Sequence, residues 1–248
     1  MNNTEQNYED FISTVSHELR TPLTSIRGFS QTMLSSWDKL DDNSKQKFIK
    51  IIEEQSNRLI HLVENMLSVT KLQAKNNTLI YNELNIKFPI EQIISIIKNQ
   101  YPTQKFEFQY RENLPAIFVD KDKFQQIMTN LIENSAKYSS GSNTTTISTS
   151  MDNNNVLIKV SNIGITIAID DYDKIFTKFS RIDNPLTRKV QGSGLGLYIT
   201  KNLTEKMGGK IYVTSIPFEK NQELSEITFT LEFPILSLEE QARIKCNQ

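Results

Sequence analysis

"STVSHELRTPLTSIRGF" (residues 13–29) lies within a long amphipathic helix. Apolar residues and one proline recur around it at alternating intervals of three and four, which is the a/d seam of a coiled coil. The seam consists of Ile12, Val15, Leu19, Pro22, Ile26, Phe29 and Met33. With Ile12 at position a, His17 falls at f and points away from the seam, so we expect its imidazole in solvent. Pro22 lacks a backbone donor and predicts a bend near residues 18–22.

A second seam of the same kind begins at residue 52. It consists of Ile52, Gln55, Leu59, Leu62, Met66 and Val69, and Ile51, Val63 and Leu67 widen its apolar face. The polar segment between the seams, "WDKLDDNSKQ" (37–46), predicts a turn with a helix N-cap among residues 41–43. The pattern therefore predicts a helical hairpin, and two hairpins would pair as a four-helix dimer because one cannot bury so wide a face. The other histidine, His61, falls at c and is interpreted as a solvated residue.

Composition excludes several classes of protein. The 248 residues carry a net charge of −1, so no bulk field would recruit nucleic acid or an anionic membrane. A single cysteine, Cys246, excludes an intramolecular disulfide and fits a reducing compartment. No apolar run approaches the roughly 20 residues of a membrane span, and the start is not a signal peptide. We expect a cytoplasmic location, either as a soluble protein or as the cytoplasmic part of a membrane-anchored sensor.

The periodicity changes near residue 80. Helical patterns occupy 88–100 and 121–140, and strand patterns occupy 105–111, 116–120, 144–151, 155–162, 208–215 and 225–234. This irregular alternation predicts an α+β sandwich with one mostly antiparallel sheet and helices on one face. The expected organisation is a helical hairpin over residues 1–78, an α/β domain over 79–236, and a charged tail over 237–248 that frays or packs loosely.

Two motifs in the second part suit a bound phosphate group. Asn130, Asn134 and Lys137 recur at i, i+4 and i+7 on one helix face, against the low helix propensity of asparagine. Their carbonyl oxygens suit magnesium held beside phosphates, although a plain polar helix face would give the same pattern. "GSGLGLYITKNL" (192–203) is a glycine-rich start to a helix, where backbone N–H groups can cradle phosphate. The polar segment before it, 181–190, has the composition of a lid.

Four segments together resemble a known family. They are "SHELRTPL", "NLIENSAKY", "IFTKFSRID" and "GSGLGL", and in this order they resemble the H, N, F and G2 boxes of bacterial sensor histidine kinases over residues 8–234. The resemblance implies a dimerisation and phosphoacceptor hairpin followed by an ATP-binding domain of the Bergerat-type fold. It also implies ATP-dependent autophosphorylation of His17, with Mg²⁺, and phosphoryl transfer to an aspartate in the receiver domain of a response regulator.

The same resemblance assigns roles to individual residues. His17 would be the phosphoacceptor, Glu18 would accept its other ring N–H, and Thr21 would orient water for dephosphorylating the regulator. Arg181 would neutralise charge on the transferring group. Asn134 would be the magnesium ligand, and the nucleotide would be bound by Asn130, Lys137, Tyr138, Asn162, Gly164, Gly192, Gly194, Leu195 and Gly196.

The chain departs from the family in the G1 box, which usually reads Asp-x-Gly-x-Gly. Here "NIGIT" (162–166) has Asn162 for the aspartate that accepts from the adenine amino group, and Thr166 for the second glycine. The lost charge costs about 1–3 kcal/mol of binding, and Thr166 adds a side chain near the base or at a positive φ. Two interpretations stay open: a working kinase with weakened ATP affinity, or a regulator phosphatase or dimeric scaffold. A third, an ATPase clamp of the same superfamily, is disfavoured by the heptad hairpin.

Overall fold

The structure, a computed structural model, describes residues 3–73, 78–140, 142–180, 192–218 and 221–246. It divides into two compact units, residues 1–70 and residues 71–248. The predicted lid over 181–190 lies outside the described residues.

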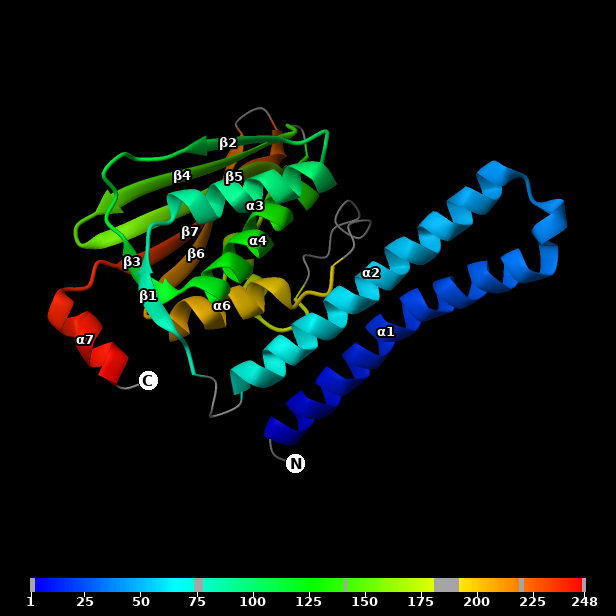
Figure 1. Ribbon diagram of the computed structural model, residues 1–248, viewed down its shortest axis with the longest axis horizontal. Coiled ribbons are helices and arrows are strands. Elements are labelled where there is room, and N and C mark those ends of the chain that lie inside the picture. Colours follow the sequence, from blue (N-terminus) through cyan, green and yellow to red (C-terminus); the bar gives the residue numbers. More distant parts are fainter. Residues whose placement is uncertain (1–2, 74–77, 141, 181–191, 219–220, 247–248) are drawn as a thin grey trace. The chain divides into compact units, whose positions relative to one another are not determined.

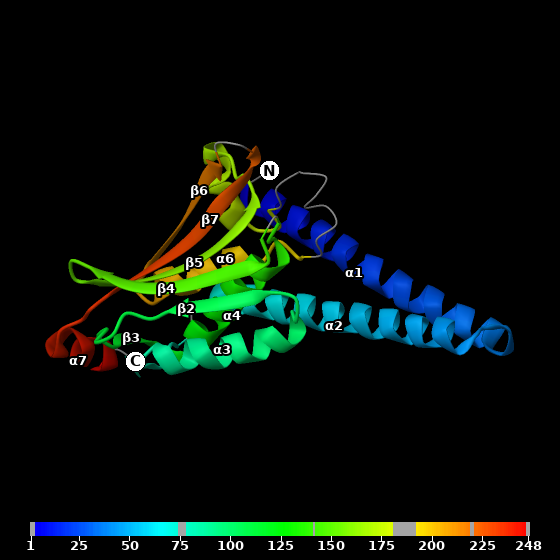
Figure 2. The same cartoon turned by 90° about the horizontal axis from the view of Figure 1, so that it is seen from above.

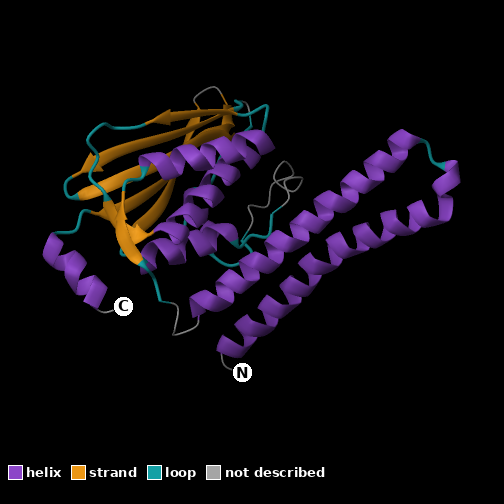
Figure 3. Cartoon of the chain, viewed as in Figure 1, coloured by secondary structure: helices purple, strands orange, loops and turns teal. Residues whose placement is uncertain are grey.

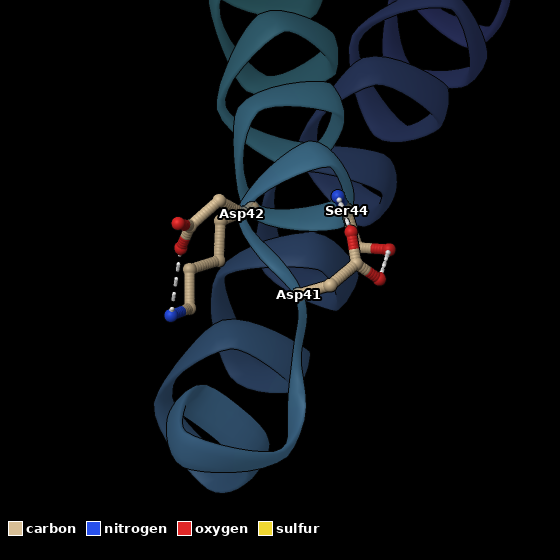
Figure 4. A network of polar contacts seen from close by, with 4 residues as sticks. Asp41, Asp42 and Ser44 are labelled. Carbon is tan, nitrogen blue, oxygen red and sulfur yellow. Dashed lines mark hydrogen bonds and ion pairs between the residues drawn. The ribbon is translucent and has the colours of Figure 1, made fainter.

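The first unit is a hairpin of two long helices (Figures 1 and 3). Helix α1 (Asn3–Ser36) continues through Pro22, and the 3₁₀ turn η1 (Trp37–Lys39) leads to α2 (Asp42–Gln73). Asp41 caps α2, as the sequence predicted for residues 41–43: its carboxylate accepts from the backbone N–H of Ser44 at 2.9 Å and from the Ser44 hydroxyl at 2.7 Å (Figure 4). These two hydrogen bonds hold the pKa of Asp41 below its ordinary value.

The two seams of the hairpin face each other. Pro22 and Leu62 are buried, and the rings of Phe29 and Phe48 lie 5.1 Å apart between the helices. Other large apolar side chains of the hairpin stay exposed, namely Ile12, Leu23, Leu34, Ile49, Ile60, Val63 and Leu67. One hairpin thus leaves a second apolar surface uncovered, as the width of the sequence pattern predicted.

The second unit contains a five-stranded sheet in the order β2-β4-β5-β7-β6. Its strands are β2 (Lys105–Gln109), β4 (Thr144–Asp152), β5 (Asn155–Ile165), β6 (Lys210–Phe218) and β7 (Asn221–Pro234). Within this sheet only the β2–β4 pair is parallel, so the predicted mostly antiparallel character is confirmed, whereas the prediction of a single sheet is wrong because the 116–120 strand lies outside it. A separate two-stranded sheet pairs β1 (Tyr81–Leu84) with β3 (Ile117–Asp120).

Three helices cover one face of the five-stranded sheet (Figures 1 and 2). They are α3 (Lys87–Gln100), α4 (Lys121–Lys137) and α6 (Gly196–Lys206). Helix α4 buries Phe124, Ile127, Met128, Leu131, Ile132 and Ser135, which is one helical face. Strand β5 buries every second residue, namely Val156, Ile158, Val160, Asn162 and Gly164. Alternation therefore places Asn162 and Gly164 on the side of the sheet that the core occupies.

The segment after the sheet is helical. Residues 237–248 were predicted to fray or pack loosely; the structure forms helix α7 (Leu238–Cys246), and most of its described residues are exposed, which agrees with loose packing but not with fraying. A capping box explains its start, because Ser237 Oγ accepts from the Glu240 N–H while the Glu240 carboxylate accepts from the Ser237 N–H at 2.8 Å. Within the described residues, no helix combines the length and apolar character needed to cross a bilayer.

Candidate functional site

His17 lies exposed on α1, as its heptad position predicted. Thr21, one turn later, is also exposed, and its hydroxyl donates to the His17 backbone carbonyl at 3.3 Å. His61 on α2 is exposed as well, and its Nδ1 lies 3.5 Å from a carboxylate oxygen of Glu64. The hairpin therefore presents two solvated imidazoles, and only His17 stands in the "SHELRTPL" segment.

Glu18 contacts the opposite helix of the hairpin. Its carboxylate accepts a hydrogen bond from the Arg58 guanidinium of α2 at 3.3 Å, and both side chains are about one fifth exposed. The expected hydrogen bond from the His17 ring to Glu18 stays a prediction. Sequence reasoning missed Arg58, although the signal was present: both partners occupy position g of their heptads, the flank beside the seam where ion pairs form.

Helix α4 carries the predicted asparagine face, and the structure shows what holds it. Asn130 donates from Nδ2 to the Thr200 hydroxyl of α6 at 2.8 Å, which ties the two helices together. Thr200 is buried. Asn134, one turn further along α4, makes no side-chain hydrogen bond to another described residue and is partly exposed. Its amide oxygen is therefore available to a ligand.

Lys137 is not an isolated cation, because its ammonium lies 3.2 Å from the Glu133 carboxylate. Glu133 also acts on Tyr101 at the end of α3: burial first, and the nearby Glu133 charge second, raise the pKa of that phenol to about 12. The sequence predictions did not include Glu133. Its i, i+4 spacing from Lys137 was the available signal.

The glycine turn before α6 packs against two other segments. Gly194 has φ +67°, and a Cβ there would lie 2.7 Å from the backbone of Phe179, so only glycine fits both the conformation and the space. At Gly196, the first residue of α6, a Cβ would overlap Asn130 Oδ1 and lie 3.0 Å from its Cγ. Leu195 is fully buried beneath the turn. The turn and the asparagine face of α4 are thus in direct contact.

The end of β5 meets the end of α4. A Cβ at Gly164 would lie 2.7 Å from the Tyr138 carbonyl oxygen and 3.0 Å from Asn162 Nδ2. A Cβ at Gly192 would lie 3.4 Å from the Tyr138 hydroxyl. Tyr138 therefore links the G1 segment to the glycine turn. Asn162 is buried, and its Nδ2 has no hydrogen-bond partner among the described residues.

Thr166 does not have the positive φ that was one of the two possibilities predicted from the sequence. The described non-glycine residues with positive φ are Asn113, Asn153 and Phe179, so Thr166 is not held in the left-handed region. Its hydroxyl lies 2.7 Å from the Ser225 hydroxyl of β7, and its N–H donates to the Glu223 carbonyl. The hydroxyl and N–H groups of Thr166, the second substitution in the G1 box, are therefore satisfied by hydrogen bonds to strand β7.

Most predicted nucleotide residues thus converge within the second unit, on the ends of α4 and β5 and the start of α6. Arg181 lies outside the described residues. No group of three or more His, Cys, Asp or Glu side chains in the described segments could hold a metal ion. A cation at this site would instead take the Asn134 amide oxygen and ligand phosphates, a donor set that suits magnesium.

Comparison with family models identifies two domains. Residues 8–75 match the His Kinase A (phospho-acceptor) domain, and residues 119–235 match the histidine kinase-, DNA gyrase B- and HSP90-like ATPase domain. The first match contains His17 and the second contains the α4–β5–α6 site. An ATPase clamp would lack the phosphoacceptor domain, so that alternative is not favoured.

Two curated relatives agree with the domain matches. Sensor histidine kinase WalK of Bacillus subtilis is 32% identical over 237 residues, covering 92% of this chain and 37% of the relative. Signal transduction histidine-protein kinase ArlS of Staphylococcus haemolyticus is 31% identical over 205 residues, covering 83% of this chain and 45% of the relative. The chain therefore spans about two fifths of the length of these relatives.

Solved structures share the fold. Acinetobacter baumannii histidine kinase AdeS superposes with a TM-score of 0.66 at 23% identity, covering 89% of this chain and 98% of that one. Histidine kinase ThkA, solved in complex with response regulator protein TrrA, superposes with a TM-score of 0.68 at 24% identity, covering 92% of this chain and 61% of that one. With a phosphoacceptor hairpin carrying an exposed histidine and an ATPase-type sandwich after it, the chain belongs to the bacterial sensor histidine kinase family.

Proposed function

We propose that the chain phosphorylates His17 with ATP and passes the phosphoryl group to an aspartate of a response regulator. The observation that carries the proposal is the exposed imidazole of His17 within the phosphoacceptor match. A phosphoacceptor must be reached first by a nucleotide-bearing domain and then by a partner protein. A buried ring could serve neither, whereas a solvated ring on a helix surface can serve both.

In the first step, a ring nitrogen of neutral His17 attacks the γ-phosphorus of ATP. An N–P bond forms, the P–O bond to the β-phosphate breaks, and ADP leaves. In the second step, a carboxylate oxygen of the regulator attacks the same phosphorus and the N–P bond breaks. Glu18 orients the ring, and its contact with Arg58 keeps its carboxylate beside the seam. Thr21 orients water in a separate phosphatase reaction, in which the water oxygen attacks the phosphorus of the regulator's acyl phosphate and the aspartate carboxylate leaves with inorganic phosphate as the other product.

The residues of the second unit fit a nucleotide with magnesium. Asn134 offers an amide oxygen that has no hydrogen-bond partner among the described residues, and Asn130 is held beside the glycine turn by Thr200. The N–H groups at the start of α6 have no intrahelical acceptors and can bind phosphate oxygens. Tyr138 provides the aromatic face for the base, and Asn162 and Gly164 line its edge. A bound magnesium ion would neutralise phosphate charge during transfer.

We also propose that two copies of the chain form a dimer, because one hairpin leaves an apolar surface uncovered. Ile60, Val63 and Leu67 are each 42–54% exposed and recur at i, i+3 and i+7 on α2. A second copy of the hairpin offers the same stripe, so two copies can bury it in a four-helix bundle. Sedimentation equilibrium should give twice the chain mass of 28.6 kDa, and Val63→Glu with Leu67→Glu should give a monomer. A wild-type monomer at micromolar concentration would refute the dimer.

Labelling with γ-³²P-ATP and Mg²⁺ tests the kinase directly. We expect an acid-labile, alkali-stable label on the wild-type chain, no label on His17→Ala, and full label on His61→Ala. The last variant is a matched control, because it removes the other exposed histidine of the hairpin. Label that survives His17→Ala would contradict the assignment of the phosphoacceptor.

The substitution at Asn162 separates the two interpretations that the sequence left open. Wild-type label that rises when Asn162→Asp is made supports a working kinase with weakened ATP affinity. No label on wild type, with label restored by Asn162→Asp, would favour the phosphatase or scaffold. Asn134→Ala should abolish label in either background, since it removes the proposed magnesium ligand.

A further inference from the structure

Two buried polar atoms in the described part of the chain lack a hydrogen-bond partner, Ser135 Oγ and Asn162 Nδ2. They come from the buried face of α4 and from the core side of β5, the two elements that meet at the proposed nucleotide site. A buried donor without a partner is a standing free-energy cost, and native structures usually keep one only for a reason. The Asn162 orphan is the more informative, because it stands where the family has a carboxylate.

The local structure holds Asn162 in a fixed place, but no described residue forms a hydrogen bond with its Nδ2. The residue is 4% exposed, it pairs in the sheet with Thr145 and Ile227, and its Nδ2 lies beside Gly164. A half-turn about its last side-chain torsion exchanges Oδ1 and Nδ2 with almost no change in shape. The amide can therefore offer an acceptor or a donor to a ligand without disturbing its neighbours.

An ionised carboxylate at this position could act only as a hydrogen-bond acceptor. It accepts hydrogen bonds and cannot donate them, so it attracts the 6-amino group of adenine and repels the 6-oxo group of hypoxanthine or guanine. Rejection of the 6-oxo base comes from this repulsion as much as from attraction of the 6-amino base. An amide oxygen still accepts a hydrogen bond from the 6-amino group, although without a negative charge. The amide also does not repel the 6-oxo group, because its NH₂ group can donate a hydrogen bond to the oxo oxygen.

We infer that Asn162 makes the base site tolerant of both 6-amino and 6-oxo purines, so that the chain uses ITP or GTP as phosphoryl donor nearly as well as ATP. This inference rests on the proposed function, since it assumes that a nucleotide base lies against Asn162. Asn162 is then a specificity-determining residue. With adenine it turns Oδ1 to the amino group, and with a 6-oxo purine it turns Nδ2 to the carbonyl oxygen.

ITP is the sharpest probe, because its base differs from adenine at the 6-substituent and the adjoining N1 proton but adds no 2-amino group. The dissociation constants of Mg·ATP and Mg·ITP are measured by calorimetry on the full chain, and His17 labelling is run with each γ-labelled nucleotide. We expect the two constants of the wild type to agree within about fivefold. Asn162→Asp should shift the preference toward ATP by roughly tenfold or more, because the restored carboxylate repels the 6-oxo group and accepts from the 6-amino group. Asn99→Asp, the same change at an exposed position of α3, should leave the ratio unaltered.

The outcomes separate the two proposals. Wild-type binding of ATP with His17 label, and rejection of ITP by more than tenfold, would overturn the base tolerance and leave the kinase proposal standing. Binding of neither nucleotide would overturn both. The ratio of the wild-type dissociation constants for ATP and ITP tests the base tolerance without any variant. The tolerance can therefore be tested even if the buried charge in Asn162→Asp prevents folding. If the wild type binds ATP and ITP comparably and Asn162→Asp does not change the ratio of the two dissociation constants, the tolerance comes from another residue and the role of Asn162 is overturned.

Discussion

Replacing Gly196 by alanine should damage nucleotide binding much more than folding. The added methyl group would overlap Asn130 Oδ1 and lie 3.0 and 3.1 Å from Cγ and Nδ2 of the same side chain. Asn130 must therefore move, and its 2.8 Å hydrogen bond to Thr200 breaks. Thr200 is 1% exposed, so water cannot easily replace the lost partner.

The magnitude follows from two opposing terms. Breaking a hydrogen bond to a buried hydroxyl costs about 1–3 kcal/mol of folding free energy, while glycine to alanine in a helix returns about 0.5–1 kcal/mol. The net loss is roughly 0–2.5 kcal/mol, or a fall in Tm of at most about 10 °C for a unit of this size. Nucleotide affinity should fall by roughly 10- to 150-fold, since one hydrogen bond to a charged phosphate is worth about 1.5–3 kcal/mol.

Calorimetric titration with Mg·ATP and thermal unfolding followed by circular dichroism give both quantities on the same sample. Asn130→Ala provides the coupled control: without Oδ1 there is no overlap, so adding Gly196→Ala to that variant should cost nothing further. Unchanged ATP affinity in Gly196→Ala, or full additivity of the two substitutions, would show that the contact between α4 and α6 does not organise the site.

Three further predictions concern stability. Gly28→Ala, where an added methyl group meets nothing within 4 Å, should raise the hairpin's free energy of unfolding by about 0.5–1 kcal/mol; a decrease in the urea midpoint would mean that this face is packed in the dimer. Asp41→Ala should lower the Tm followed at 222 nm and Asp41→Asn should largely restore it. The pKa of Asp41 is lower in the folded chain than in the unfolded chain. Its contribution to the free energy of unfolding is therefore present above the unfolded pKa and is lost as the pH falls through the folded pKa. If the Tm of Asp41→Ala falls with decreasing pH in the same way as that of the wild type, the cap does not stabilise α2. Burial raises the pKa of Tyr101 to about 12, so its contribution to the free energy of unfolding is complete below pH 10 and is lost as the pH rises toward 12. Tyr101→Phe should therefore lose less stability over this pH range than the wild type. Equal slopes of stability against pH in the two proteins would contradict the prediction.

Period and spacing were sufficient for most of the helices and strands, and for the faces on which the candidate site residues lie, but not for β1 or α7. The 3,4 alternation predicted the hairpin and an exposed His17, and the two-residue alternation predicted the strands that the structure forms as β4 and β5. The asparagine face of α4 was readable because asparagine is unfavourable inside a helix. These are local properties, since a 3.6- or two-residue period decides which side chains share a face before any tertiary contact forms.

The partners of those side chains were decided by tertiary structure. Nothing in the spacing of α4 indicated that Asn130 would bond to Thr200, because that contact joins residues 70 positions apart. The same holds for Thr166, whose hydroxyl is satisfied by Ser225 on a later strand. The sequence by itself determined which residues lie on which face and which chemistry each face offers. Only the packing of α6 against α4, and of β7 against β5, decided which polar groups are paired and which, like Asn162 Nδ2, have no partner among the described residues, because hydrogen bonds depend on distances that a one-dimensional pattern does not contain.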